Sequence, residues 1–199
     1  MPRAFFYHVA FLLAMVALAV LRVRYWRRQR TVLGTSFLRK EGTLTEIRQI
    51  FAILAFLAIV VQTIYPGLLD RLEFPAPYGI RAVGAALTVV SLVVLARVTN
   101  EVMTLLQPRE RRSLIKTGVY GRVRHPLFAA AGATAWALTL LSASWVVAVL
   151  AAAYSLDLLI RARIDDRRLA EEFGAAYSVY AARVPAFVPR LDSSPGLAR

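Results

Sequence analysis

The chain has 199 residues, of which 58% are apolar, and a formal net charge of +13 at pH 7. A mean hydropathy of +0.56 excludes a disordered or nucleic-acid-binding tail and is more than one soluble core requires. The lack of cysteine excludes disulfides, thiolate metal sites and cysteine nucleophiles. The two histidines, His8 and His125, lie far apart in the sequence, so we expect no metal site. These values predict an integral membrane protein.

Apolar runs divide the chain into segments long enough to cross a bilayer, for which a helix needs about 20 residues. We expect the first three spans at residues 4–21, 47–69 and 78–96. The last run, residues 126–160, is too long for one span and carries polar residues near its middle, which predicts two helices joined by a tight turn. The predicted fold is therefore all-α, with five transmembrane helices of which the last two form a hairpin.

The basic residues gather in three stretches of the chain. Eight lie in residues 22–48, seven in residues 97–124 and seven in residues 161–199, with only three elsewhere. In a five-span arrangement the three groups share one side, so the positive-inside rule places the N-terminus outside and the C-terminus in the cytoplasm. We expect the first span to stay uncleaved, because no small-residue cleavage site follows it. The expected location is a bacterial inner membrane. Nucleic acid is not an expected partner, because the charges do not form one soluble face with stacking aromatics.

The segment between the third and fourth spans contains several turn-forming residues. Gly118 and Gly121 favour turns, and Pro126 suits the first turn of the helix that follows. Arg124 and His125 are then expected at a helix N-terminus, where free N–H groups and the helix dipole favour an anion. Such residues at a lipid interface also serve simply as anchors, and the pattern alone leaves both interpretations open.

After the fifth span, aromatic and charged residues recur at helical spacing. Four of them predict one face of a helical stretch: Leu169, Phe173, Tyr177 and Tyr180. Val184 precedes a proline, so we expect the helix to end there. Asp157, Arg161 and Asp165 are spaced by four and can form ion pairs where the helix leaves the bilayer. Asp157 is the most informative of these three, because an ionisable side chain within a span normally faces a partner or a cavity.

These two segments contain motif residues in a fixed order and spacing. The set comprises Leu114, Gly118, Tyr120, Arg124-His125-Pro126, Asp165-Asp166, Leu169, Phe173-Gly174, Tyr177, Tyr180, Val184-Pro185 and Pro189. As a set it resembles the isoprenylcysteine carboxyl methyltransferase family, which is related to the membrane phospholipid methyltransferases. The resemblance covers residues 114–190, the expected catalytic core of a single domain at 1–199 that ends in a flexible tail at 192–199. Phe128 and Ala130 depart from the Tyr and Gly of the family, and the aspartate pair replaces its usual glutamates.

The resemblance implies S-adenosylmethionine as methyl donor, held beneath a cytoplasmic helical cap. The expected cofactor-binding residues are Tyr120, Arg124, His125, Pro126, Asp165, Asp166, Tyr177 and Tyr180. The cationic residues suit the cofactor carboxylate, the aspartates its amine and the tyrosines its adenine. Arg161 or Arg163 would hold the carboxylate of the acceptor in the catalytic site, through the planar guanidinium. No Gly-x-Gly-x-x-Gly sequence competes as a nucleotide site.

The expected acceptor is lipid-like or prenylated, enters from the bilayer among membrane lipids, and is methylated at a carboxylate. Three alternatives stay open from the sequence. The first is N-methylation of a phospholipid amine, the second is an NADPH-dependent membrane reductase of the sterol type, and the third is a non-catalytic relative. Cofactor preference and turnover distinguish them.

Overall fold

The computed structural model describes residues 2–33, 57, 61, 72–105 and 113–189. The helices of this part are α1 (Pro2–Leu33), α5 (Tyr78–Leu105), the 3-10 helix η3 (Gly118–Gly121), α6 (Pro126–Ser142), α7 (Trp145–Phe173) and α8 (Ala175–Arg183). The all-α prediction is confirmed for these residues. The predicted second span, residues 47–69, and the tail, residues 192–199, fall on or largely on residues outside this description. The count of five spans therefore stays a prediction.

Among the described residues, three helices are long and apolar enough to cross a membrane. They are Phe6–Gln29 within α1, Tyr78–Leu105 and Trp145–Phe173, whereas Pro126–Ser142 is a shorter apolar helix. The helices continue past the predicted limits of the first, third and last spans, which were placed at residues 21, 96 and 160. At about 1.5 Å per residue, the 29 residues of α7 are longer than the hydrocarbon core of a bilayer is thick.

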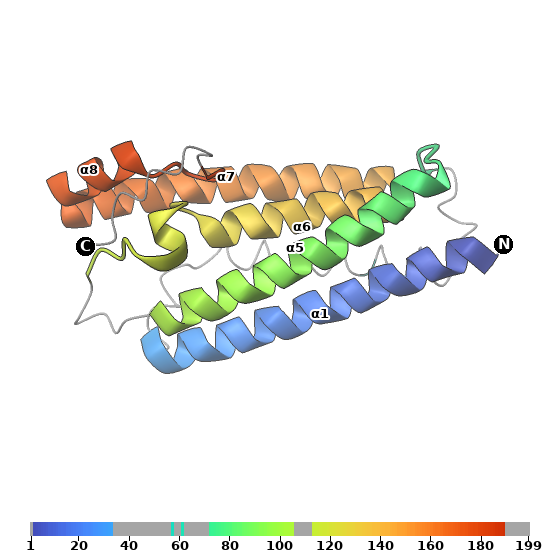
Figure 1. Cartoon of the computed structure of the whole chain (residues 1–199), viewed down its shortest axis with the longest axis horizontal. Coiled ribbons are helices and arrows are strands. Elements are labelled where there is room, and N and C mark those ends of the chain that lie inside the picture. The colour runs from blue at the N-terminus through green and yellow to red at the C-terminus, as the bar shows by residue number, and fades with distance from the viewer. Residues whose placement is uncertain (1, 34–56, 58–60, 62–71, 106–112, 190–199) are drawn as a thin grey trace.

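The long helices lie side by side, as Figure 1 shows. α1 and α5 run in the same direction, α6 runs back, and α7 returns to the end of the bundle where α8 lies, which we call the α8 end. The last turns of α1 and α5, the start of α6 and the turn η3 meet at this end. The basic residues of α1 from Arg22 to Arg28 and those of α7 from Arg161 onward lie toward it. The described basic residues are therefore concentrated at one end of the bundle.

A tight turn joins α6 to α7, which confirms the predicted helical hairpin. Ala143 adopts a left-handed conformation (φ 50°) and is fully buried, and Ser144 precedes α7 in an extended conformation. The N–H of Phe74 donates to the Ala143 carbonyl at 2.9 Å, and the ring of Phe74 packs edge-on against Trp145 at 5.3 Å. The chain before α5 therefore holds the hairpin turn at the end opposite α8.

α5 and α6 cross with their backbones in close contact. A side-chain carbon added to Gly84 would lie 2.6 Å from the carbonyl carbon of Leu140, so glycine permits this approach. One turn further along α5, the hydroxyl of buried Thr88 donates to the Gly84 carbonyl at 2.8 Å. Buried Thr134 on α6 makes the same kind of contact, to the Ala130 carbonyl at 2.8 Å. These hydroxyls are satisfied by their own helix and impose no polar cost on the interface.

A second break separates α7 from α8 at Gly174. This residue has φ 52° and ψ −127°, a conformation that strongly favours glycine. The predicted helical stretch through Leu169, Phe173, Tyr177 and Tyr180 is therefore two helices rather than one. The four side chains still meet, because α8 packs against the end of α7, and they form one apolar cluster with Val184 and Leu114.

Candidate functional site

The start of α6 is held by the chain that follows α8. The N–H of Arg124 donates to the Pro185 carbonyl and the N–H of His125 to the Ala186 carbonyl, both at 2.9 Å. Pro126 begins α6 after these two residues, as predicted, and it is buried. The short segment after Val184 therefore fixes the backbone from which the Arg124 and His125 side chains project.

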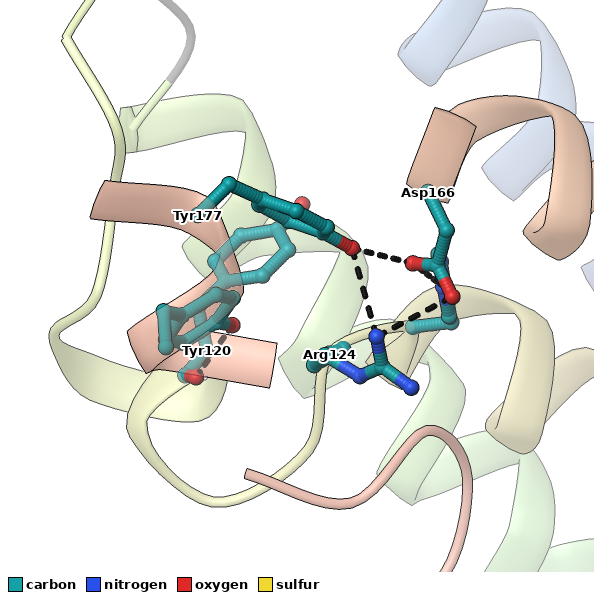
Figure 2. A network of polar contacts seen from close by, with 6 residues as sticks. Tyr120, Arg124, Asp166 and Tyr177 are labelled. Atoms are coloured by element: carbon teal, nitrogen blue, oxygen red, sulfur yellow. Dashed lines mark hydrogen bonds and ion pairs between the residues drawn. The ribbon is translucent and has the colours of Figure 1, made fainter. Parts of the chain in front are cut away.

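Asp166 on α7 lies at the centre of a polar network. Its Oδ1 is 2.8 Å from Nε2 of His125 and its Oδ2 is 3.1 Å from Nη1 of Arg124. The hydroxyl of Tyr177 on α8 donates to the same carboxylate, and it accepts from Arg124 Nη1 at 3.4 Å. Figure 2 shows the Arg124, Asp166 and Tyr177 side chains pointing toward one another. One carboxylate thus joins three elements of the α8 end.

The histidine ring is enclosed by aromatic side chains. Phe128, one turn along α6, stacks parallel to the His125 ring with centroids 5.6 Å apart. Phe187, from the segment after α8, covers the ring at 5.7 Å. His125 is 7% exposed. The phenylalanine that departs from the family pattern therefore packs against the imidazole and helps to orient it toward Asp166.

The two tyrosines of α8 are almost fully buried and point into the site. Tyr180 donates its hydroxyl to the Tyr120 carbonyl at 2.7 Å, which joins α8 to η3. Tyr177 and Tyr180 contact each other with ring centroids 5.9 Å apart. Their exposed fractions are 3% and 4%, so both rings form the wall between α8 and the bundle, whereas Tyr120 is half-buried.

Burial raises the pKa of these phenols further above neutral pH. It raises the pKa of Tyr180 to about 12. Burial, followed by the hydrogen bond to Asp166, raises the pKa of Tyr177. Burial is also the main cause of the raised pKa of Tyr120, and the nearby Tyr25, Tyr180, Asp165 and Glu101 raise it further. All three hydroxyls are therefore hydrogen-bond donors at neutral pH.

The two candidate acceptor-binding arginines occupy different environments. Arg161 is 25% exposed and its Nε lies 3.1 Å from Oδ2 of Asp157, an ion pair that confirms the first contact of the predicted i, i+4 series. That Nε is buried and makes no hydrogen bond within the described part of the chain. Arg163 is exposed. Of the two, only Arg161 has a guanidinium held in place by an ion pair that the structure defines.

The turn η3 is anchored by a residue that the sequence motifs did not include. Glu101, near the end of α5, accepts the N–H of Val119 through Oε1 at 2.7 Å. Gly118 has φ 63°, and any side chain there would overlap the same carboxylate oxygen. From α1, Tyr25 also lies close enough to influence Tyr120 and accepts from Gln29 Nε2 at 3.1 Å. An acidic residue near the end of an apolar span was the available signal, because such residues normally face a partner.

The structure brings most of the predicted site residues together. Arg124, His125, Asp166 and Tyr177 share one network, and Tyr120 and Tyr180 border it through their own hydrogen bond. Asp165 is half-buried on α7 and lies near Tyr120. Arg161 lies about one turn of α7 before these aspartates, whereas Arg163 is exposed. Because Asp166 already accepts from three groups, its first role is to organise the site.

Of two comparisons with known proteins, one gives a match, and that match overlaps the site. A search of curated proteins finds no match to the chain. A protein-family model matches residues 79–171, a segment that begins in α5 and ends before α8. The match therefore extends further toward the N-terminus than the motif residues do, and it does not include Tyr177 or Tyr180. Over residues 79–171 the chain matches the isoprenylcysteine carboxyl methyltransferase (ICMT) family, the same family that the motif residues resemble.

Proposed function

We propose that this protein is an integral membrane methyltransferase that takes its methyl group from S-adenosylmethionine and transfers it to a carboxylate of a lipid-like or prenylated acceptor. The matched family suggests a membrane methyltransferase, in agreement with the three helices of the described part of the chain that are able to cross a bilayer. The choice of cofactor and acceptor is supported by one observation. A network of four polar side chains lies at one end of an apolar bundle: Arg124, His125, Asp166 and Tyr177. There, a polar cofactor and a lipophilic acceptor can be bound side by side.

The residues of the α8 end fit the polar groups of this cofactor. Nε of Arg124 is buried without a hydrogen-bond partner among the described residues, which suits a ligand carboxylate. Asp165, half-buried near Tyr120, supplies negative charge for the cofactor amine. The half-buried ring of Tyr120 is the aromatic surface best suited to adenine, because Tyr177 and Tyr180 are packed into the α8 wall.

The bound cofactor would supply an activated methyl group on a sulfonium, and a carboxylate acceptor is already nucleophilic at neutral pH. Transfer of that methyl group to a carboxylate oxygen would leave the electron pair of the broken S–CH₃ bond on sulfur and would require no proton transfer from the protein. Catalysis then requires that the protein hold both ligands in line and exclude water. The ion pair of Asp166 with Arg124 and its hydrogen bond from Tyr177, both partly buried, hold these two side chains in position and so serve this purpose.

The acceptor carboxylate is assigned to Arg161 rather than Arg163. Arg161 is half-buried on α7, and its Nε is paired with Asp157, which orients the guanidinium and leaves its two terminal nitrogens to face an acceptor. A planar guanidinium with spare donors recognises a carboxylate well. Arg163, exposed on the same helix, is the matched control.

The direct test is incubation of the purified protein with labelled S-adenosylmethionine and a panel of acceptors: a prenylcysteine, a fatty acid and an aminophospholipid. We expect base-labile label on a carboxylate acceptor and calorimetric binding of the cofactor. Label on the aminophospholipid would show that the protein methylates an amine nitrogen and not a carboxylate oxygen. Binding of NADPH in preference to S-adenosylmethionine, or cofactor binding without turnover on any acceptor, would contradict the proposal.

Arg161→Ala and Arg163→Ala then test the acceptor assignment. Loss of a charge-assisted hydrogen bond corresponds to about a tenfold effect, so Arg161→Ala should raise the acceptor KM by about tenfold with little change in cofactor affinity. Arg163→Ala should leave both values close to those of the parent protein. Equal effects of the two substitutions would show that Arg161 has no special role.

A further inference from the structure

We propose that Glu101 is a positioning residue: its carboxylate holds the turn that carries Tyr120 in the geometry that ligand binding requires. This inference rests on the proposed function only for the identity of the ligand. It concerns α5, a helix to which the sequence motifs assign no role in the site.

The contact between Glu101 and the turn is specific. Oε1 of Glu101 accepts the N–H of Val119 at 2.7 Å across 18 residues of sequence. Gly118 adopts a left-handed conformation (φ 63°), and a side chain there would overlap Oε1. The approach of this carboxylate to the turn therefore depends on a glycine immediately before Val119.

The position of Glu101 on its helix is unfavourable unless the contact compensates for it. α5 ends at Leu105, so Glu101 lies within about one turn of the negative end of the helix dipole. It is half-buried at the end of an apolar span, where a carboxylate also loses hydration. Burying an amide N–H against a charged acceptor recovers part of this cost. A residue chosen only to stabilise α5 would not be acidic here.

The contact is transmitted to the site through Tyr120. On one side the turn is bound by Glu101 through the Val119 N–H, and on the other by Tyr180 through the Tyr120 carbonyl. Tyr180 packs on Tyr177, which donates to Asp166. Four residues after Tyr120, Arg124 begins the segment bound to the chain after α8. Glu101 therefore fixes one end of a continuous series of contacts that reaches the centre of the network.

The experiment compares Glu101→Ala with Glu101→Gln, whose side-chain carbonyl can still accept the Val119 N–H. Two readouts are measured in detergent: hydrogen exchange of the peptide covering residues 117–122, and the Kd for S-adenosylmethionine by calorimetry. Glu101→Ala should speed exchange of that peptide, leave peptides of α6 and α7 unchanged, and raise the Kd about tenfold. Glu101→Gln should remain within about threefold of the parent Kd, because it loses the charge but keeps the acceptor.

Val102→Ala is the matched control on the same turn of α5. Val102 is 5% exposed, so its truncation destabilises the helix packing without removing the contact to Val119. Gly118→Ala provides a second variant that displaces the turn and leaves α5 intact, and its Kd should rise as well. If Val102→Ala weakens binding as much as Glu101→Ala, or if Glu101→Gln does not restore it, the positioning role is overturned.

The two proposals fail in distinguishable ways. A parent protein that binds no S-adenosylmethionine contradicts the proposed function. A parent protein that binds it, with unchanged affinity in Glu101→Ala, contradicts the positioning role alone. Faster exchange of residues 117–122 without a change in Kd would reduce Glu101 to a structural contact and would also overturn the inference.

Discussion

Nε2 of His125 lies 2.8 Å from Oδ1 of Asp166, and this contact joins the residue just before α6 to the C-terminal part of α7. The two residues are 41 positions apart in the sequence. Because His125 is buried between Phe128 and Phe187, the imidazole cannot turn away without disrupting the aromatic packing. His125 therefore acts first as a rigid support for the carboxylate.

Asp166→Ala should lower both stability and cofactor affinity. The substitution leaves the Arg124 guanidinium, 17% exposed, without its carboxylate and removes the acceptor of Tyr177. Truncating one member of a charged hydrogen-bonded network costs about 1.5–3 kcal/mol, and partial exposure of the pair places the effect at the lower end. Thermal unfolding in detergent and calorimetric titration measure the two effects. Asp166→Asn, which keeps an acceptor oxygen, should lie between the parent and Asp166→Ala, and an unchanged affinity in both would contradict the assignment of the site.

Stability should fall between about pH 10 and pH 12 because of the buried tyrosines. The pKa of Tyr180 is raised from the usual 10.0 to about 12, so in this window the unfolded chain loses the phenolic proton while the folded chain keeps it. The contribution is fully present below pH 10 and is lost as pH rises toward the folded pKa. Unfolding midpoints across this range, with phenolate absorbance as the probe, measure it. Tyr180→Phe should show a shallower decline, and an identical slope would contradict the burial argument.

Substitution of Gly84 should disrupt the crossing of α5 and α6. An alanine there would overlap the α6 backbone at Leu140 and force the helices apart, at a cost of about 1–3 kcal/mol. Gly79→Ala is the control on the same helix, because its added carbon would meet nothing within 4 Å. The midpoint of thermal unfolding should fall for Gly84→Ala and stay close to the parent value for Gly79→Ala. Similar midpoints for both variants would show that the crossing is looser than the structure indicates.

Truncation of Phe187 should weaken cofactor binding and lower the stability of the fold by comparable amounts. Phe187→Ala removes one of the two rings that hold His125, while the backbone bonds from Arg124 and His125 to Pro185 and Ala186 stay possible. We expect a Kd several-fold higher and a loss of about 1 kcal/mol or more of stability, in line with the loss of an aromatic contact and its buried area. Val188→Ala, next in sequence and 75% exposed, should change neither value. A Kd that moves equally in both variants would contradict the role of the ring.

The sequence predicted the helices well because hydropathy and turn residues report local structure. Tyr78 was correctly placed as the start of a span, and the turn near Ser144 was correctly placed between two helices. The first and third helices continue past the spans predicted for them, because charged residues mark the expected edge of the bilayer and not the end of a helix. The break at Gly174 was missed, since helical spacing of Leu169, Phe173, Tyr177 and Tyr180 continues across it.

The motif residues of the site were predictable as a set, but their partners were not. Arg124, His125 and Asp166 were expected to bind ligand separately, whereas they bind one another. Contacts across long sequence separations, such as Glu101 with Val119 or Phe187 with His125, depend on helix packing that periodicity does not encode. The exposed position of Arg163 likewise depends on how α7 is turned against α6.

The reversal at Gly174 has a consequence for the order in which the site can be assembled. In one straight helix, Asp166 and Tyr177 would lie about 16 Å apart along the axis, but the reversal brings the phenol to the carboxylate. During synthesis from the N-terminus, Arg124 is made first and remains without its anion until α7 and then α8 emerge. The site is therefore completed only after the helices before it are in place. A nascent chain that stops short of residue 187 would have the helices of the bundle but would lack the contacts that hold Arg124 and His125 in position.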